Sequence, residues 1–203
     1  RRPPRSTPSN SSAASDVYKR QILVWLGNMI LVWLHYNLGK WGLMTALLCY
    51  TYMLVISFAL TKFFEKESIT ERFGFQTRNL LILLIATCSS LTFLYLLKVN
   101  IFNFFVINFT IIAPLMEEIF YRGYILGSLC GKADEMNRES LKWILLTSIL
   151  FSIGHVFILA RNLLPYIYVL IFGFIEGIIY VKTKTISWVY IAHMICNIKF
   201  FIF

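Results

Sequence analysis

Polar side chains of the kind that enzymes use for acid–base chemistry interrupt several long apolar stretches of this sequence. They are Glu117, Glu118, Arg122, His155, Glu176, His193 and Asn197. Ionisable side chains are costly inside a membrane and usually serve a function there. Carboxylates and imidazoles can move protons, and an amide can donate a hydrogen bond to an oxyanion. Such a set could activate water for hydrolysis without a serine or cysteine nucleophile.

The composition places these side chains in a membrane protein. Hydrophobic residues make up 58% of the chain and charged residues 14%, whereas a soluble domain has about 25% charged residues. A helix needs about 20 apolar residues to cross a bilayer. Apolar segments cover residues 22–36, 43–61, 79–97, 101–128, 143–160, 165–181 and 186–203. The predicted fold class is therefore all-α, a polytopic transmembrane helix bundle of about seven spans.

The basic residues predict an orientation. Loops 62–78, 129–142 and 182–185 hold four, three and two Lys or Arg residues, whereas the alternate loops hold only Lys40, Lys98 and Arg161. Cytoplasmic loops are the ones enriched in Lys and Arg, so the N-terminus is expected in the cytoplasm. The net charge of +9 is explained by this distribution, and no nucleic-acid partner is expected.

The candidate residues fall at matching depths in three spans. Glu117, His155 and His193 lie about 7–12 residues from the expected cytoplasmic ends of their segments, or roughly 10–18 Å deep at 1.5 Å per residue. Asn197 follows His193 by one helical turn, so both side chains share a face. We therefore expect these polar groups to meet at one level of the bilayer.

The segment from 101 to 128 carries most of these polar groups. Glu118 and Arg122 are four residues apart and can form an ion pair. Glu117 points about 100° away from Glu118 on a regular helix, so the two carboxylates can serve different tasks. Pro114 removes a backbone hydrogen bond just before them and is expected to loosen the helix.

Three motifs resemble those of the CPBP family, the CAAX-prenyl-protease and bacteriocin-processing membrane proteins, also called Abi. Its EExxxR motif resembles APLMEEIFYRG at residues 113–123. Its FxxxH and HxxxN motifs resemble FSIGH at 151–155 and HMICN at 193–197. The likeness covers about residues 79–203, and three motifs in this order are more specific than any one alone.

The resemblance implies an intramembrane endopeptidase acting on a peptide or protein substrate at the lipid bilayer. It implies that Glu117 and His155 activate water and that His193 and Asn197 stabilise the oxyanion. Interhelical hydrogen bonding is the competing role for Asn197. The compact chain is more similar to the bacterial members, which favours a bacterial cell membrane and a role in bacteriocin processing or self-immunity. CAAX-like tail removal stays open as the other role. The orientation expected from the basic loops places the catalytic site toward the cytoplasmic side.

Other residues of the site are given lesser roles. The resemblance assigns Glu118 and Arg122 a supporting role, and a purely structural ion pair is the alternative. The family more commonly has an apolar or small residue at position 176, so Glu176 departs from its pattern and receives no assigned chemistry.

No cofactor is firmly expected. Glu117, His155 and His193 form a plausible zinc-ligand set with room for water, yet no HExxH motif is present. Glu117 acting as a base without a committed metal is the favoured mechanism. The four cysteines lack CxxC spacing, so neither a disulfide framework nor a zinc knuckle is expected.

Two other classes of protein remain open. A proton-coupled transporter also uses membrane carboxylates and histidines, but the sequence shows no paired internal repeats. A non-catalytic immunity or scaffold protein would keep the motifs without turnover.

The two ends and one loop carry further expectations. Residues 1–21 form a polar leader that looks non-native, the transmembrane domain covers 22–203 with its protease-like core at about 79–203, and both ends look truncated. Loop 62–78 is either an amphipathic helix on the inner membrane surface or an ordinary solvated loop.

Overall fold

The computed structural model describes residues 11–38, 42–130, 136–157 and 163–201, and this part of the chain is helical without strands. The elements are α1 (Ser11–Asn37), α2 (Gly42–Phe63), α3 (Ile69–Phe73), α4 (Thr77–Leu96), α5 (Phe104–Ile107), the π-helix η2 (Asn108–Ile112), α6 (Ala113–Glu117), the π-helix η3 (Glu118–Leu126), α7 (Gly127–Cys130), α8 (Arg138–Gly154), α9 (Leu163–Thr183), α10 (Ile186–Ile198) and the 3-10 helix η4 (Lys199–Phe201). The prediction of an all-α fold is confirmed.

Four of these helices are long and apolar enough to cross a membrane. They cover Leu43–Phe63, Thr77–Leu96, Phe104–Cys130 and Leu163–Thr183, and the shorter α10 is also apolar. Each of the seven predicted apolar segments falls on a helix, while loop residues Lys40 and Arg161 and segment ends 158–160 and 202–203 lie outside the described residues. Helix α1 joins the end of the predicted polar leader to the first apolar segment.

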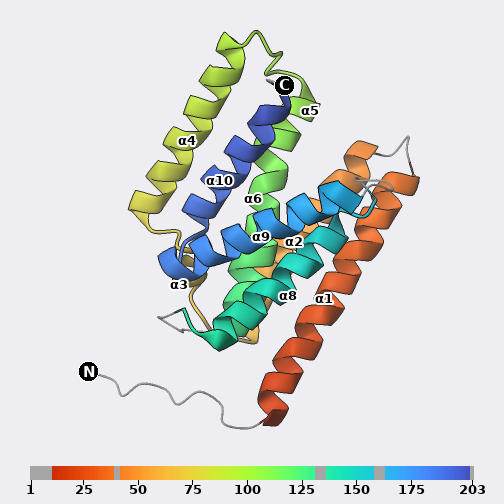
Figure 1. The fold of residues 1–203 in the computed structure, drawn as a ribbon, viewed down its shortest axis with the longest axis vertical. Helices are drawn as coiled ribbons and strands as arrows, with labels where there is room; N and C mark the ends of the chain where they lie inside the picture. The colour runs from red at the N-terminus through yellow and green to blue at the C-terminus, as the bar shows by residue number, and fades with distance from the viewer. Residues whose placement is uncertain (1–10, 39–41, 131–135, 158–162, 202–203) are drawn as a thin grey trace.

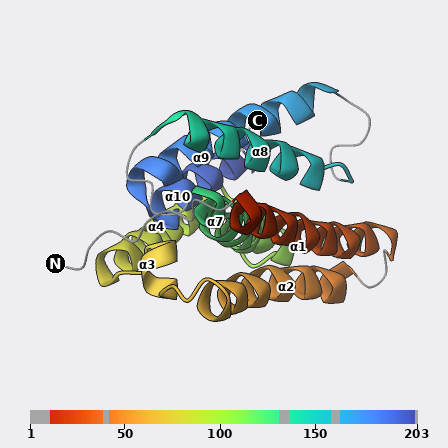
Figure 2. The ribbon, with the colours of Figure 1, turned by 90° about the horizontal axis from the view of Figure 1, so that it is seen from below.

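The helix from Phe104 to Cys130 lies at the centre of the bundle. It is packed by α2 and α3 on one side and by α8, α9 and α10 on others. Figures 1 and 2 show α1 paired with α2, α8 paired with α9, and α4 beside α10 at the edge. Only 6% of the apolar stretch of α4 is buried, against 39% for the central helix. Of the four long apolar helices, α4 therefore has the most surface available for contact with lipid.

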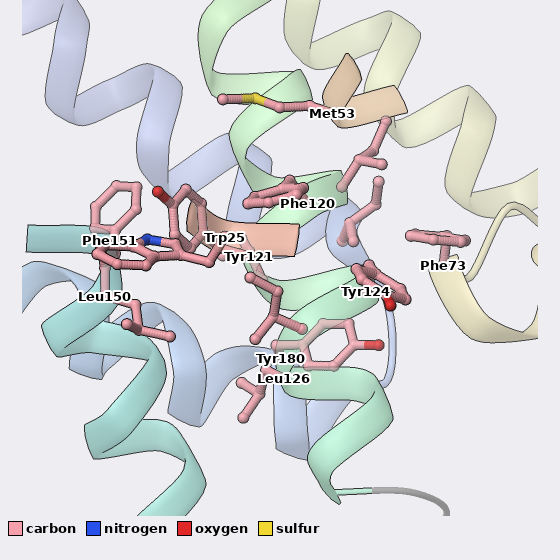
Figure 3. Close-up of a cluster of buried hydrophobic side chains, with 14 of the residues drawn as sticks. Trp25, Met53, Phe73, Phe120, Tyr121, Tyr124, Leu126, Leu150, Phe151 and Tyr180 are labelled. Carbon is pink, nitrogen blue, oxygen red and sulfur yellow. Dashed lines mark hydrogen bonds between the residues drawn. The ribbon is translucent and has the colours of Figure 1, made fainter. Parts of the chain in front are cut away.

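The apolar core is built around the central helix. Phe120, Tyr121 and Tyr124 of η3 are almost completely buried. Trp25 from α1 and Phe151 from α8 belong to the same cluster, and Figure 3 shows these side chains around the central helix. Packing from several helices therefore fixes the rotation of the segment that carries both glutamates.

Pro114 lies where the sequence predicted a disturbed helix. It occupies the first turn of α6, between the two π-helical stretches η2 and η3. A π-helix changes the angular spacing of successive side chains and is often found at functional sites. Here it alters how the neighbouring residues Glu117 and Glu118 are presented.

Loop 62–78 forms the short helix α3, but that helix turns inward. Arg72 and Phe73 are buried, and Phe73 stacks on Phe75 and packs edge-on against Phe58. The Arg72 guanidinium donates to Glu67 Oε2 at 2.9 Å and to Glu65 Oε2 at 2.7 Å. One face of this segment is therefore tied into the bundle, while most of its residues are exposed. Its place at the inner membrane surface stays a prediction.

Helix α8 differs from the expected segment 143–160 at both ends. It begins at Arg138 behind a capping box formed by Asn137 and Ser140, and it ends at Gly154. His155 is the C-cap residue. The histidine thus stands at a helix end, where its position is set by the chain turn as well as by the helix.

Candidate active site

Glu117 faces two histidines that come from two other helices. Its Oε2 atom lies 3.9 Å from His155 Nε2 and 3.8 Å from His193 Nε2. The Glu117 and His155 side chains are each 17% exposed, and that of His193 is 6% exposed. The structure therefore brings together three of the residues that the sequence analysis selected.

Hydrogen bonds on the far side of each imidazole fix which nitrogen faces Glu117. His155 Nδ1 lies 2.8 Å from the Phe151 carbonyl oxygen, and His193 Nδ1 lies 2.7 Å from Glu118 Oε1. A carbonyl or an ionised carboxylate can only accept, so both Nδ1 atoms are donors. In the neutral imidazole the Nε2 atom then presents a lone pair toward Glu117.

Behind His193 lies a buried network of charged groups. Arg122 Nη1 donates to Glu118 Oε1 at 3.2 Å, as the four-residue spacing predicted. Arg122 Nη2 donates to Glu176 Oε2 at 2.5 Å and to the Gly173 carbonyl at 3.3 Å. The side chains of Glu118 and Glu176 are completely buried. Buried charges persist only when they are paired and hydrogen-bonded, and this network meets that condition for Arg122.

A glycine makes room for this network. A Cβ atom at Gly173 would lie 3.3 Å from Arg122 Nη2 and 3.1 Å from Phe151 Cδ1. The Arg122 guanidinium also lies over the Phe151 ring, 4.2 Å from its centroid. Helices η3, α8 and α9 therefore meet closely around one cation.

Asn197 is placed one turn beyond His193 and binds the central helix. Its side-chain amide donates to the Phe109 carbonyl oxygen at 2.8 Å. An amide nitrogen carries two N–H donors, so this bond occupies one of them. The carbonyl of Phe109 belongs to the π-helix η2, where the backbone hydrogen-bond pattern departs from that of an α-helix.

Comparison with protein families identifies the chain. The family model for type II CAAX prenyl endopeptidase Rce1-like proteins matches residues 98–199, which is about half of the chain. The chain belongs to this Rce1-like family. Searches among curated proteins and among solved structures gave no match.

The Rce1-like match covers the central helix, α8, α9 and α10, and so every residue of the site. Family membership and four apolar helices of spanning length make this chain an integral membrane protein. Helices α1, α2 and α4 lie outside the matched residues. They pack around a core that the Rce1-like family model describes.

Two sets of residues in this Rce1-like chain offer metal-ligand chemistry. Glu117, His155 and His193 present one carboxylate oxygen and two imidazole nitrogens, a donor set that zinc accepts. Their separations of 3.8 and 3.9 Å are somewhat longer than the roughly 3.4 Å between two ligands of one tetrahedral zinc. Among the described residues, Glu118, Glu176 and His193 also offer donor atoms within 4.8 Å of one another.

The second set is already engaged by a cation. Arg122 bonds to both Glu118 and Glu176, and His193 donates its Nδ1–H to Glu118. A metal ion there would have to displace these bonds and lie beside a guanidinium. The set of Glu118, Glu176 and His193 is thus better described as a charge network. The set of Glu117, His155 and His193 is compatible with either a water molecule or a metal ion.

Glu176 belongs to the site although no motif contains it. The sequence showed an ionisable residue within an apolar segment, which is a signal of function in a membrane protein. Its direction could not be derived, because α9 has apolar residues around most of its circumference. The contact with Arg122 depends on how α9 packs against the central helix.

Proposed function

We propose that this protein is an intramembrane endopeptidase that hydrolyses a peptide bond of a membrane-associated substrate with a water molecule activated by Glu117. The observation that carries this proposal is the convergence of Glu117 Oε2 with the Nε2 atoms of His155 and His193 at 3.9 and 3.8 Å. Glu117 Oε2 and His155 Nε2 are two proton acceptors, which match the two hydrogen bonds that a water molecule can donate.

The first step is attack of this water on the substrate carbonyl carbon. Glu117 accepts one water proton while the water oxygen bonds to the carbon, and His155 Nε2 holds the water in place. General base catalysis of this kind contributes about 10²–10⁴ in rate. When the C–N bond breaks, Glu117 returns the proton to the leaving amine. The products are a carboxylic acid and an amine, and the carboxylate of Glu117 is restored.

The developing oxyanion is stabilised by hydrogen bonds from His193 and Asn197. His193 can donate to it only as an imidazolium, in which the Nδ1–H stays bonded to Glu118 Oε1. In that form Nε2–H of His193 donates to the oxyanion. The second amide N–H of Asn197 is the other donor. Each such donor is worth about 10²–10³ in rate.

The substrate class follows from the family and the location of the site. A CAAX prenyl endopeptidase family acts on lipid-modified C-terminal tails, and a site within an apolar bundle favours a substrate that already lies in the bilayer. We therefore assign a prenylated C-terminal peptide as the first substrate to test. Processing of bacteriocin precursors is the second, on the likeness of the motifs to bacterial members.

The test is cleavage by purified protein in proteoliposomes. A farnesylated CAAX-type peptide, the same peptide without the lipid, and a bacteriocin-leader peptide are each incubated with the wild type and with Glu117→Gln, and products are identified by mass spectrometry. The exposed Glu71 on α3 provides the matched control Glu71→Gln. Cleavage by the wild type and Glu71→Gln, but not by Glu117→Gln, is expected. Equal cleavage by all three proteins, or no cleavage by any, would contradict the proposal.

The same assay distinguishes a metal from a metal-free site. If Glu117 acts as base without a metal, a chelator leaves the rate unchanged. If zinc is held by Glu117, His155 and His193, the chelator abolishes cleavage and added zinc restores it. A scaffold or transporter would show no Glu117-dependent cleavage in either condition.

A further inference from the structure

Glu176 is a fully buried carboxylate for which the proposed reaction has no task. It lies on α9, a long helix of the matched region that supplies none of the three motifs. Its Oε2 atom bonds to Arg122 Nη2 at 2.5 Å. Its Oε1 atom faces His193 Nδ1 at 3.6 Å. The carboxylate therefore reaches from the arginine to the imidazole.

Glu118 makes the same two contacts from the central helix. Its Oε1 atom lies 3.2 Å from Arg122 Nη1 and 2.7 Å from His193 Nδ1. Two carboxylates from different helices thus face one imidazole N–H and one guanidinium. For positioning alone, a single carboxylate is enough, as in many carboxylate–histidine pairs.

One oxygen of Glu176 lies close to His193 without forming a hydrogen bond. Glu176 Oε1 is buried and has no hydrogen-bond partner among the described residues. A buried acceptor without a partner is unfavourable, so such an atom calls for an explanation. The neighbouring His193 N–H already donates to Glu118, and a movement of about 0.5 Å would bring Glu176 Oε1 within hydrogen-bond range of it.

The packing of α9 allows this second carboxylate to enter. Gly173 and Gly177 lie on either side of Glu176 along the helix, and a Cβ atom at Gly177 would lie only 2.7 Å from Ile144 Cγ2 of α8. Small residues at four-residue spacing let membrane helices approach closely. Glu176 is therefore held against Arg122 by the backbone packing of α8 and α9.

We propose that Glu176 is a second positioning residue for His193: its carboxylate faces the Nδ1–H beside Glu118 and accepts this N–H when the Glu118 bond is lost. The inference rests on the proposed function, because it gives His193 a rate-determining orientation. It concerns a carboxylate at position 176, where the family resemblance leads us to expect an apolar or small residue.

The kinetic test compares Glu118→Gln, Glu176→Gln and the double variant, with Glu71→Gln as the control. Loss of a supporting partner typically costs about 10–100-fold. We expect each single variant to lose about tenfold in kcat with unchanged KM, and the double variant to lose about 10³-fold, more than the product of the two. A double variant that loses only the product of the single effects, or a Glu176→Gln variant with wild-type kcat, overturns the inference.

A spectroscopic signature separates positioning from a loss of folded protein. The Nδ1–H proton of His193, observed with isotope-labelled histidine, should keep the signal of a charge-assisted hydrogen bond to a carboxylate in each single variant. It should lose that signal in the double variant, where only glutamine amide oxygens face it. His155 serves as the internal reference, because its Nδ1–H bonds to the Phe151 carbonyl and should not change. A His193 signal already lost in Glu118→Gln contradicts the takeover by Glu176. This readout needs no cleavage, so it tests the inference even if the proposed hydrolysis fails.

Discussion

At the scale of single residues, Asn197 has two roles that the geometry allows together. Its amide ties α10 to the Phe109 carbonyl at 2.8 Å, and its second N–H is the one assigned to the oxyanion. A hydrogen bond between membrane helices contributes about 0.6 kcal/mol on average. An oxyanion donor contributes about 10²–10³ in rate. Loss of the helix contact should therefore change mainly the stability, whereas loss of the oxyanion donor should change mainly the cleavage rate.

We predict that Asn197→Ala lowers kcat by about 10²–10³ while KM stays unchanged and the free energy of unfolding falls by only about 0.6 kcal/mol. The matched control is Tyr190→Phe, which removes another hydrogen bond of α10, that between Tyr190 and Thr87 at 3.2 Å. Steady-state kinetics and thermal unfolding of both variants check this. Equal small losses of kcat in the two variants would show that Asn197 only holds helices together.

The sequence analysis could find Glu117, His155 and His193 because charge is rare in apolar segments and their depths match. It could also predict the Glu118–Arg122 pair, because helical spacing alone brings those side chains together. It could not connect Glu176 to Arg122. That contact joins residues 54 positions apart and depends on the rotation of α9, which no periodic pattern in the sequence fixes.

At the scale of elements, α3 shows how a charged segment becomes part of a membrane bundle. Arg72 is buried and binds Glu65 and Glu67, and Tyr180 of α9 donates to the Arg72 carbonyl at 3.0 Å. Ser128, next to the end of the central helix, donates to Glu65 Oε1 at 2.5 Å. The segment thus holds the ends of α9 and of the central helix together.

We predict that Arg72→Gln lowers the free energy of unfolding by about 1–3 kcal/mol, because it leaves buried carboxylate oxygens without a cation. Loop 64–68 should also become more sensitive to added protease. The control is Arg78→Gln, because Arg78 is in the same segment but exposed and should change neither measurement. Equal effects of the two substitutions would show that the buried charge cluster does not stabilise α3.

Pattern analysis missed the inward packing of α3 for a physical reason. Alternating charged and aromatic residues suit a helix at the membrane surface, and they suit a segment that pairs its charges internally equally well. The inward packing depends on Phe73, whose ring fills the space that Gly123 of the central helix leaves because it has no side chain. Likewise, the end of α8 at Gly154 could not be seen, since the apolar sequence continues beyond it.

At the scale of the whole molecule, the basic loops predict the orientation of the bundle. Loops 62–78 and 182–185 hold six Lys or Arg residues (four and two), whereas the loop between α4 and α5 holds only Lys98. Such asymmetry predicts that the first two loops face the cytoplasm. We propose that a prenylated tail approaches the buried site from that side.

We predict that Lys66→Cys and Lys98→Cys react with a membrane-impermeant thiol reagent from opposite sides of the membrane. Both positions are exposed. In intact cells only Lys98→Cys should be labelled, and in inside-out vesicles Lys66→Cys should be labelled. The protein with its native cysteines alone is the background control. Labelling of both positions from one side would contradict the expected topology.

The convergence of Glu117 and His155 on one water is tested most directly by a double-mutant cycle on the cleavage rate. Residues that act as a unit on one group give strongly non-additive losses. We predict that the double variant Glu117→Gln/His155→Ala is no slower than Glu117→Gln alone, because the second substitution removes help for a water that is no longer activated. If the two losses multiply in the double variant, the residues act on separate events, and the shared water does not exist.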